Sequence, residues 1–378
     1  MHLPLTRRAA LRYGTGGVFS VMLGFSKLAA SAAWATAEND GTAWHDVREW
    51  GVEGRGWKET TRYFDRLPAK AQALVRPAVW NLSRHSAGMC VRFATDSSVI
   101  RARYSLLSPN LAMPHMAATG VSGLDLYAAD NAGRMRWVAV AQPTKQEMEL
   151  TLAGSLRPGK REYAIYLPLY NGVESLQIGV EPATAFEPIP PRRTGVLAYY
   201  GTSIAHGACA GRPGMAFPAI LGRRLGLPHV NLGFSGNGKM EPELADLLAE
   251  LDAAVYCIDC LPNLTATEIE ERAEAFVKKL RGARPDVPIV LIEDRTYGNS
   301  WILPERRSRN DTSRAAFRAA YRRLLDAGVS GLEYVEGEHL LGDDNEATID
   351  GSHPSDLGMM RMADALEPVL RRVLRRPA

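Results

Sequence analysis

The second half of the chain, from Thr194 to the C-terminus, alternates short apolar runs with longer amphipathic runs. The apolar runs have the length and composition of buried strands, and the amphipathic runs have the length of helices. Strands that alternate with helices in this way form a parallel sheet with helices on both faces. We expect strands at 195–200, 229–234, 253–259, 287–293 and 332–335, and helices at 216–225, 242–251, 266–281, 312–327 and 355–374.

A sheet of this kind also constrains where a ligand binds, because ligands lie beyond the carboxyl ends of its strands. Ser203 follows the first expected strand in the turn Gly-Thr-Ser, which is a typical placement for a nucleophile. The other positions of this kind are Gly236 after the second strand, Asn263 after the third, and Asp350 and His353 before the last helix.

These residue types together supply what acyl transfer needs. A serine hydroxyl becomes a nucleophile when a base removes its proton, and His353 is the expected base for Ser203. A carboxylate at Asp350 would hold the imidazole in the right tautomer and stabilise its protonated form. The oxyanion of the tetrahedral intermediate needs fixed donors, for which we expect the N–H groups of Ser203 and Gly236 and the amide of Asn263.

Each of these residues also has an ordinary structural interpretation. Asp350 could cap the final helix, and Asn263 could form an Asx-turn. Their occurrence together at one sheet edge favours the catalytic interpretation. His206 lies one helical turn beyond Ser203 and competes as a base, but it has no evident carboxylate partner. Residues Glu293-Asp294-Arg295 follow the fourth strand, where they either contact substrate or form a structural ion pair.

The four cysteines point to an oxidising compartment and not to a metal. Cys257 and Cys260 form a Cys-x-x-Cys pair, but no second Cys or His pair completes a zinc site. Cys209 and Cys260 both fall just beyond strand ends at the same sheet edge, so we expect a disulfide between them. Cys90 lies in the first half of the chain.

The first half has a different pattern. Short runs with alternating apolar and polar residues, separated by turns, extend from about 77 to 181, and no long helical pattern interrupts them. This predicts an all-β sandwich of about 100 residues, preceded by a Trp-rich lead-in at 38–75. A proline-rich linker follows at 187–193. The expected strands are 77–83, 89–94, 98–105, 123–127, 135–140, 163–167 and 176–180.

The first 37 residues are typical of an export signal. They contain the twin arginine Arg7-Arg8, a mildly apolar stretch, and a small-x-small cleavage site that ends at Ala37. The segment resembles a Tat signal, so we expect a periplasmic or secreted protein with no membrane span in the mature chain. The alternatives are a short membrane anchor or a cytosolic terminus. The expected organisation is a signal at 1–37, a sandwich domain with lead-in and linker at 38–190, and a catalytic domain at 191–378.

The charge gives no indication of a nucleic-acid partner. The formal net charge is +3 for 378 residues, but four basic residues lie within the first 37, which contain no acidic residue. Without that segment the charge is −1, so the mature chain is nearly neutral.

The order of the site residues, with serine first, then glycine, asparagine and Asp350-x-x-His353, resembles that of the SGNH (GDSL-type) hydrolases over about residues 195–374. Two blocks depart from the usual family pattern: Gly-Thr-Ser203 replaces Gly-Asp-Ser, and Leu-Pro-Asn263 replaces Gly-x-Asn-Asp. A two-domain subgroup has the same departures and an N-terminal sandwich with the motif Gly-x-Asp-Leu-Tyr, which occurs here at 123–127.

This resemblance implies a flavodoxin-like, doubly wound α/β domain after a jelly-roll-like sandwich. It also implies that no metal or cofactor takes part, and that the substrates are esters, often acyl groups on carbohydrate. We expect Asp125, in the subgroup motif, to be structural, although it could reach the cleft. The chain is therefore expected to be an exported serine esterase that removes short acyl groups, acetyl in particular, from carbohydrate. The alternatives are an esterase or thioesterase for lipid or small-molecule acyl groups, and a non-catalytic carbohydrate-binding protein.

Overall fold

The structure, a computed structural model, describes residues 41–375, which belong to one compact unit. The expected export signal at residues 1–37 lies outside the described residues. Within the described part, none of the helices combines the length and the apolar character that crossing a bilayer requires.

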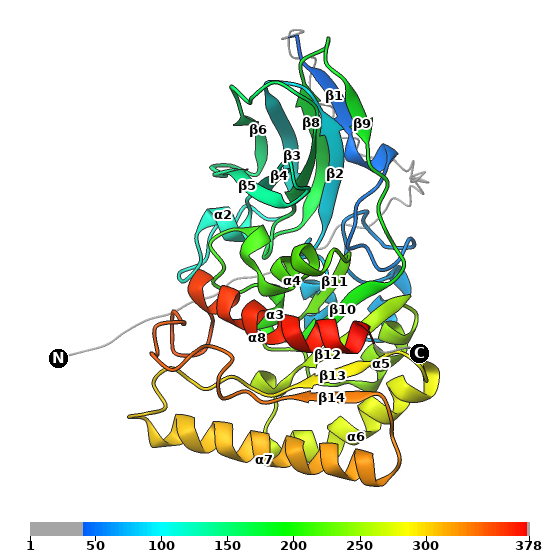
Figure 1. The fold of residues 1–378 in the computed structure, drawn as a ribbon, viewed down its shortest axis with the longest axis vertical. Helices are drawn as coiled ribbons and strands as arrows, with labels where there is room; N and C mark the ends of the chain where they lie inside the picture. The colour runs from blue at the N-terminus through cyan, green and yellow to red at the C-terminus, as the bar shows by residue number, and fades with distance from the viewer. Residues whose placement is uncertain (1–40, 376–378) are drawn as a thin grey trace, which may run out of the picture. The chain divides into compact units, whose positions relative to one another are not determined.

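The C-terminal half folds around a five-stranded parallel sheet, as the alternating pattern predicts (Figure 1). Its strand order is β11-β10-β12-β13-β14, so the first strand of this half lies between its two successors. The chain therefore changes direction across the sheet at β10, which is where ligands bind in open sheets of this kind. The strands are β10 (Val196–Gly201), β11 (His229–Gly233), β12 (Ala253–Asp259), β13 (Ile289–Ile292) and β14 (Leu332–Val335).

Helices cover both faces of this sheet, because alternate residues of each strand point to opposite sides. On β10, Leu197 and Tyr199 pack in one apolar cluster with α4 and α8. Ala198 and Tyr200 pack in a second cluster with α5, α6 and α7. These helices are α4 (Phe217–Leu225), α5 (Pro242–Ala249), α6 (Ala266–Ala283), α7 (Pro304–Asp326) and α8 (Asp356–Leu374).

Helix α7 begins at Pro304, well before the expected start at residue 312. Proline suits the first position of a helix, because its φ is already helical and the N–H that it lacks would have no partner there. Residues 304–308 are all exposed, so the first turn of α7 has no buried face. Without such a face there is no apolar periodicity from which the sequence could predict a helix.

The N-terminal half contains a β-sandwich of two antiparallel sheets, with strand orders β1-β8-β3-β6 and β5-β4-β7-β2-β9. Their facing sides share one apolar cluster, which includes Phe93, Tyr104 and Ile165. The strands are β1 (Ala43–Asp46), β2 (Cys90–Thr95), β3 (Ile100–Leu106), β4 (Asp125–Ala129), β5 (Met135–Val140), β6 (Glu147–Ala153), β7 (Arg161–Tyr166), β8 (Val173–Val180) and β9 (Phe186–Pro188).

The strand expected at 77–83 is wrong, because this segment forms helix α1 (Pro77–Leu82). Pro77 takes the first helical position, and a short apolar run cannot be assigned to strand or helix by periodicity alone. Val79 and Trp80 are buried in the apolar cluster shared with α5, α6 and α7, and not in the sandwich core. The segment between β1 and β2 thus covers the parallel sheet.

The expected Cys209–Cys260 disulfide is also wrong, because all four cysteines are free and buried. Cys209 packs in the cluster with α4 and α8, whereas Cys260 packs in the cluster on the opposite face of the sheet. The two residues follow strands at the same edge of the sheet, but the sheet lies between their side chains. A disulfide needs Cα atoms roughly 4.4–6.8 Å apart and side chains that point toward one another. Among the described residues, no group of three or more His, Cys, Asp or Glu side chains could hold a metal ion.

Candidate active site

Ser203 lies in the turn between β10 and the short helix α3 (Ser203–His206). Thr202 caps this helix, because its side-chain oxygen accepts a hydrogen bond from the N–H of Ile204 at 3.3 Å. The strand ends in glycine because a Cβ on Gly201 would lie 2.8 Å from a carbonyl oxygen of β12. Ser203 is thereby placed at the carboxyl edge of the sheet, where the sequence predicts it.

The structure brings Ser203, His353 and Asp350 together. The Oγ atom of Ser203 lies 2.8 Å from Nε2 of His353, and Nδ1 of His353 lies 2.7 Å from Oδ2 of Asp350. The other carboxylate oxygen of Asp350 accepts hydrogen bonds from the backbone N–H groups of His353 at 2.8 Å and Ser352 at 2.9 Å. The imidazole is thus held between a hydroxyl and a carboxylate.

These hydrogen bonds determine the charge of Asp350. Partial burial alone would raise its pKa, but the backbone N–H and ring of His353 and the N–H of Ser352 outweigh burial and lower the pKa to about 2. Asp350 is therefore a carboxylate at any pH at which an esterase works. A carboxylate in this position stabilises a proton on the His353 ring.

The loop between β14 and α8 fixes the position of His353. The N–H of Ile349 donates to the carbonyl oxygen of His353 at 2.9 Å, and the N–H of Gly351 donates to Oγ1 of Thr348 at 3.1 Å. Pro354 pairs with Thr348 in an isolated β-bridge, just before α8 begins. The segment that carries Asp350 and His353 is thus held by hydrogen bonds within its own loop.

Gly236 and Asn263 follow β11 and β12, the two strands that flank β10. Gly236 has a positive φ of 68°, which glycine adopts without strain. The side-chain amide of Asn263 donates to the carbonyl oxygen of Gly238 at 3.2 Å. A Cβ on Gly238 would lie 2.0 Å from the carbonyl oxygen of Gly201, so the loop after β11 packs directly on the end of β10. All three expected oxyanion donors therefore belong to adjoining strand ends.

His206 lies away from this site. Its ring is completely buried and stacks on Tyr170, with 4.2 Å between the ring centroids. Its Nε2 atom lies 3.4 Å from the guanidinium of Arg66. Burial, the Arg66 charge and His85 hold the pKa of His206 well below its usual range. His206 is therefore a neutral core residue, and its buried position gives it no access to the Ser203 hydroxyl from the site.

Glu293, Asp294 and Arg295 are buried and form ion pairs and hydrogen bonds within the protein. Arg295 binds both carboxylate oxygens of Asp259, at 2.7 and 2.8 Å. Glu293 accepts hydrogen bonds from Arg318, Tyr334 and the N–H of Gly337. The sequence left open whether this segment contacts substrate or forms an ion pair, and the structure shows ion pairs.

Asp125 has the structural position expected for it. This residue of β4 is completely buried and accepts hydrogen bonds from Arg212 at 2.9 Å, the N–H of Gly214 at 2.8 Å, and the Trp137 indole at 3.0 Å. Arg212 and Gly214 belong to the segment that follows α3. Hydrogen bonds from the motif at 123–127 therefore connect the sandwich to the segment of the α/β half that follows Ser203.

Two other residues from the sandwich half lie near the site, and no sequence motif pointed to either. The hydroxyl of Tyr170 donates to the carbonyl oxygen of Ser203 at 3.3 Å. The exposed ring of His115 lies 6.2 Å from the ring of His353, measured between centroids. Both residues are in loops, and both contacts join distant parts of the chain, which no periodicity reveals.

Comparisons with known proteins agree with this architecture. A family model described as the GDSL-like lipase/acylhydrolase family matches residues 194–371, and a model for the N-terminus of SGNH-hydrolase-type esterases, named for the GxDLY motif, matches residues 42–186. A comparison with curated proteins found no match.

Solved structures with the same fold include relatives at different distances. A structure described as a GDSL-like lipase from Bacteroides ovatus is 33% identical, with a TM-score of 0.84, over 88% of this chain and 98% of the other. A salicylyl-acyltransferase from a tetracycline biosynthetic pathway is 18% identical, with a TM-score of 0.69, over 90% and 97%. An acetyl xylan esterase from the rumen bacterium Butyrivibrio proteoclasticus is 11% identical, with a TM-score of 0.53, over 88% and 98%.

Proposed function

Because the chain belongs to the GDSL-like lipase/acylhydrolase family and is a carboxylic ester hydrolase, we propose that it is an exported serine esterase that removes short acyl groups from carbohydrate. The single observation that carries the catalytic part is the unbroken series of contacts from Ser203 through His353 to Asp350, at 2.8 and 2.7 Å. Ser203 and His353 are 150 residues apart in the chain, and their hydrogen bond aligns a hydroxyl with an imidazole that Asp350 orients, which supports the catalytic proposal.

The reaction follows from these positions. His353 takes the hydroxyl proton at Nε2 while the Oγ atom of Ser203 attacks the ester carbonyl carbon. The resulting oxyanion is stabilised by the N–H groups of Ser203 and Gly236 and by the amide of Asn263. His353 then gives its proton to the leaving alkoxide, and the acyl group remains on Ser203. Water deprotonated by His353 releases the acid and restores the serine.

The substrate part of the proposal is supported by analogy of fold. Solved proteins with this two-domain fold include the acetyl xylan esterase and a family two carbohydrate esterase from Clostridium thermocellum in complex with cellohexaose. We therefore propose acetyl groups on a polysaccharide as the natural ester.

Export is part of the proposal because of the twin arginine Arg7-Arg8 and the small residues that end at Ala37. The test is the N-terminal mass of the protein recovered outside the cytoplasm. A new N-terminus near residue 38 is expected, and retention of Met1 would contradict export.

The catalytic proposal is tested by acyl release from p-nitrophenyl esters of increasing chain length and from acetylated plant polysaccharides. The wild type is expected to prefer acetyl, and Ser203→Ala is expected to be inactive on every substrate. Equal rates in both proteins would mean that the nucleophile is wrong. A preference for long chains would favour a lipid ester, and release from no ester would favour a protein that only binds carbohydrate.

A further inference from the structure

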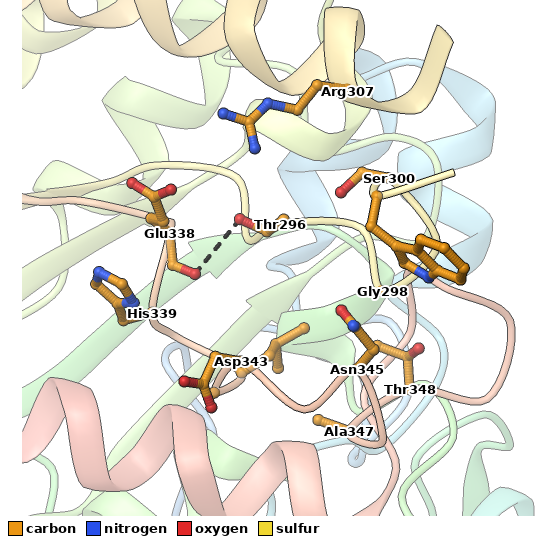
Figure 2. Close-up of a pocket in the computed structure, with 13 residues that line it drawn as sticks. Thr296, Gly298, Ser300, Arg307, Glu338, His339, Asp343, Asn345, Ala347 and Thr348 are labelled. Carbon is orange, nitrogen blue, oxygen red and sulfur yellow. Dashed lines mark hydrogen bonds between the residues drawn. The ribbon is translucent and has the colours of Figure 1, made fainter. Parts of the chain in front are cut away.

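A cavity opens between the loops that follow β13 and β14, the second of which also carries Asp350 and His353 (Figure 2). Its volume is about 260 Å³, just below the range of roughly 300–1,000 Å³ typical of sites for drug-sized ligands. A single small ring fits this volume better than an extended molecule does. Neither Ser203 nor His353 lines it, so it is separate from the proposed site of bond cleavage.

The side chains around this cavity have unused hydrogen-bonding capacity. Glu338, His339, Asp343 and Asn345 line it, and within residues 41–375 none of these four side chains makes a hydrogen bond or an ion pair. Figure 2 shows them around the cavity together with Arg307, whose guanidinium binds Asp311 only through Nε at 3.1 Å. Donors and acceptors are therefore both available.

Charged groups of both signs line the cavity. They are the two carboxylates of Glu338 and Asp343 and the guanidinium of Arg307. The carboxylates would repel a strongly anionic ligand, and the guanidinium would repel a strongly cationic one. A neutral molecule rich in hydroxyl groups can use both the donors and the acceptors.

An apolar surface adjoins these polar groups. Trp301, which also lines the cavity, is 73% exposed, and the next two residues, Ile302 and Leu303, are 59% and 43% exposed. Large aromatic side chains are rarely left this exposed without a partner. An indole beside paired donors and acceptors suits a sugar ring, whose faces carry C–H groups and whose edge carries hydroxyl groups.

The cavity shares a wall with the loop that carries the catalytic candidates. The N–H of Gly298 donates to the carbonyl oxygen of Gly351 at 2.8 Å, and Thr348 accepts from the N–H of Gly351 at 3.1 Å. Gly298 and Thr348 line the cavity, whereas Asp350 and His353 lie further along the same loop. A chain of sugars that crosses this loop would contact both places.

From these observations we infer that the cavity of Figure 2 binds an unreacting sugar ring of a polymeric substrate, while a neighbouring ring presents its ester to Ser203. This inference rests on the proposed function, because it assigns a second site to the same substrate. With such a second site, kcat/KM would depend on the length of the carbohydrate chain. The contact with the cavity would contribute to binding of a polymer and not to reaction of a single acetylated sugar.

The test compares three substrates: p-nitrophenyl acetate, xylose tetraacetate and acetylated xylan. The variants are Trp301→Ala and Asp343→Asn, with Leu325→Ala as control, because Leu325 is 47% exposed at the far end of α7 and away from the cavity. Removal of a good anchor at a binding site costs about tenfold or more. We therefore expect kcat/KM on acetylated xylan to fall about tenfold in both variants, through KM, with unchanged rates on the two small esters and an unchanged melting temperature.

Two results would overturn the inference. An equal loss on p-nitrophenyl acetate would mean that the variants disturb the catalytic residues, and no loss on the polymer would mean that the cavity does not bind it. If no acetylated carbohydrate is a substrate at all, the proposed function fails separately. In that case calorimetric titration of wild type and Trp301→Ala with unesterified cellohexaose, xylohexaose and mannohexaose decides the sugar site, and no binding to the wild type would refute it.

Discussion

At the residue scale, His353 is held from two sides by groups with different tasks. In the proposed mechanism, Ser203 offers the proton that the ring accepts, and Asp350 faces the nitrogen that keeps its own proton. Asp350 also accepts two backbone hydrogen bonds from its own loop. Its carboxylate is therefore needed both for the tautomer of the ring and for the shape of the turn.

Replacing Asp350 by Asn should separate these two tasks. The amide oxygen can still accept the backbone N–H groups, but the amide cannot stabilise a protonated ring. We expect kcat on p-nitrophenyl acetate to fall about 10³–10⁴-fold, with KM and the melting temperature nearly unchanged. Steady-state kinetics measure this, with Asp344→Asn as the control from the same loop. A loss of less than about tenfold in Asp350→Asn would mean that another carboxylate acts on His353.

Asp294 gives a prediction about stability and pH. Burial is the main cause that raises its pKa from 3.8 to about 6, and the nearby Arg295 opposes this shift. A carboxyl group with a raised pKa in the folded state stabilises the protein below its unfolded pKa, and that stability is lost as pH rises through about 6. Between pH 4 and pH 7, Asp294 should therefore cost up to roughly 3 kcal/mol.

The variant Asp294→Asn should lose less of its unfolding free energy than the wild type between those two pH values. Urea unfolding at pH 4.5 and pH 7.5 measures the difference. Asp311→Asn is the control, because Asp311 is an exposed carboxylate of α7. Parallel changes in wild type and Asp294→Asn would show that Asp294 does not titrate in this range.

At the element scale, the segment between β1 and β2 is anchored by the fully buried side chain of Arg66. Its guanidinium donates to the carbonyl oxygens of Gly233 at 2.7 Å and Asn231 at 3.0 Å, both on β11. It also donates to the carbonyl oxygens of Leu82 at 2.7 Å and His85 at 3.0 Å. Burial lowers its pKa to about 9, so the group remains charged at neutral pH.

Replacing Arg66 by Met should destabilise the protein by about 3 kcal/mol or more, because two buried and two partly buried carbonyl oxygens would lose their donor. Arg66→Lys should recover only part of this, since an ammonium group cannot match the fork of a guanidinium. Urea unfolding with Arg62→Met as the exposed control measures both. Equal stability of Arg66→Met and the wild type would contradict the anchoring role.

The elements themselves show what a sequence can predict. The parallel strands were predicted closely, because strands buried on both faces are apolar runs bounded by turns. The sequence did not predict β1, β6 or β9 at the sheet margins. β6 contains Glu147 and Glu149 on its exposed side, and β9 is only three residues long. For the loops around the site, the sequence predicted only where each one begins, at the end of a strand. It could not predict contacts such as that of His115 with His353, because these depend on tertiary packing.

At the scale of the whole molecule, the sandwich and the α/β half are joined by the segment that follows Ser203 and α3. Asp125 is the centre of this contact, since it binds both the side chain of Arg212 and the backbone of Gly214. The space there is tight, because a Cβ on Gly214 would lie 2.9 Å from the carboxylate of Asp125. Tyr127 adds a second partner for Arg212.

Replacing Asp125 by Ala should therefore affect both halves at once. It leaves the partly buried Arg212 without its carboxylate and the buried N–H of Gly214 without its acceptor, which should cost about 3 kcal/mol. The segment that contains Arg212 and Gly214 begins just after α3, so activity should fall together with stability. Adding Arg212→Met to Asp125→Ala should restore part of the stability, because it removes the unpaired charge. Calorimetry of the single and double variants measures this coupling. Additive losses would show that the two side chains do not stabilise one another, and that other contacts hold the sandwich against the catalytic half.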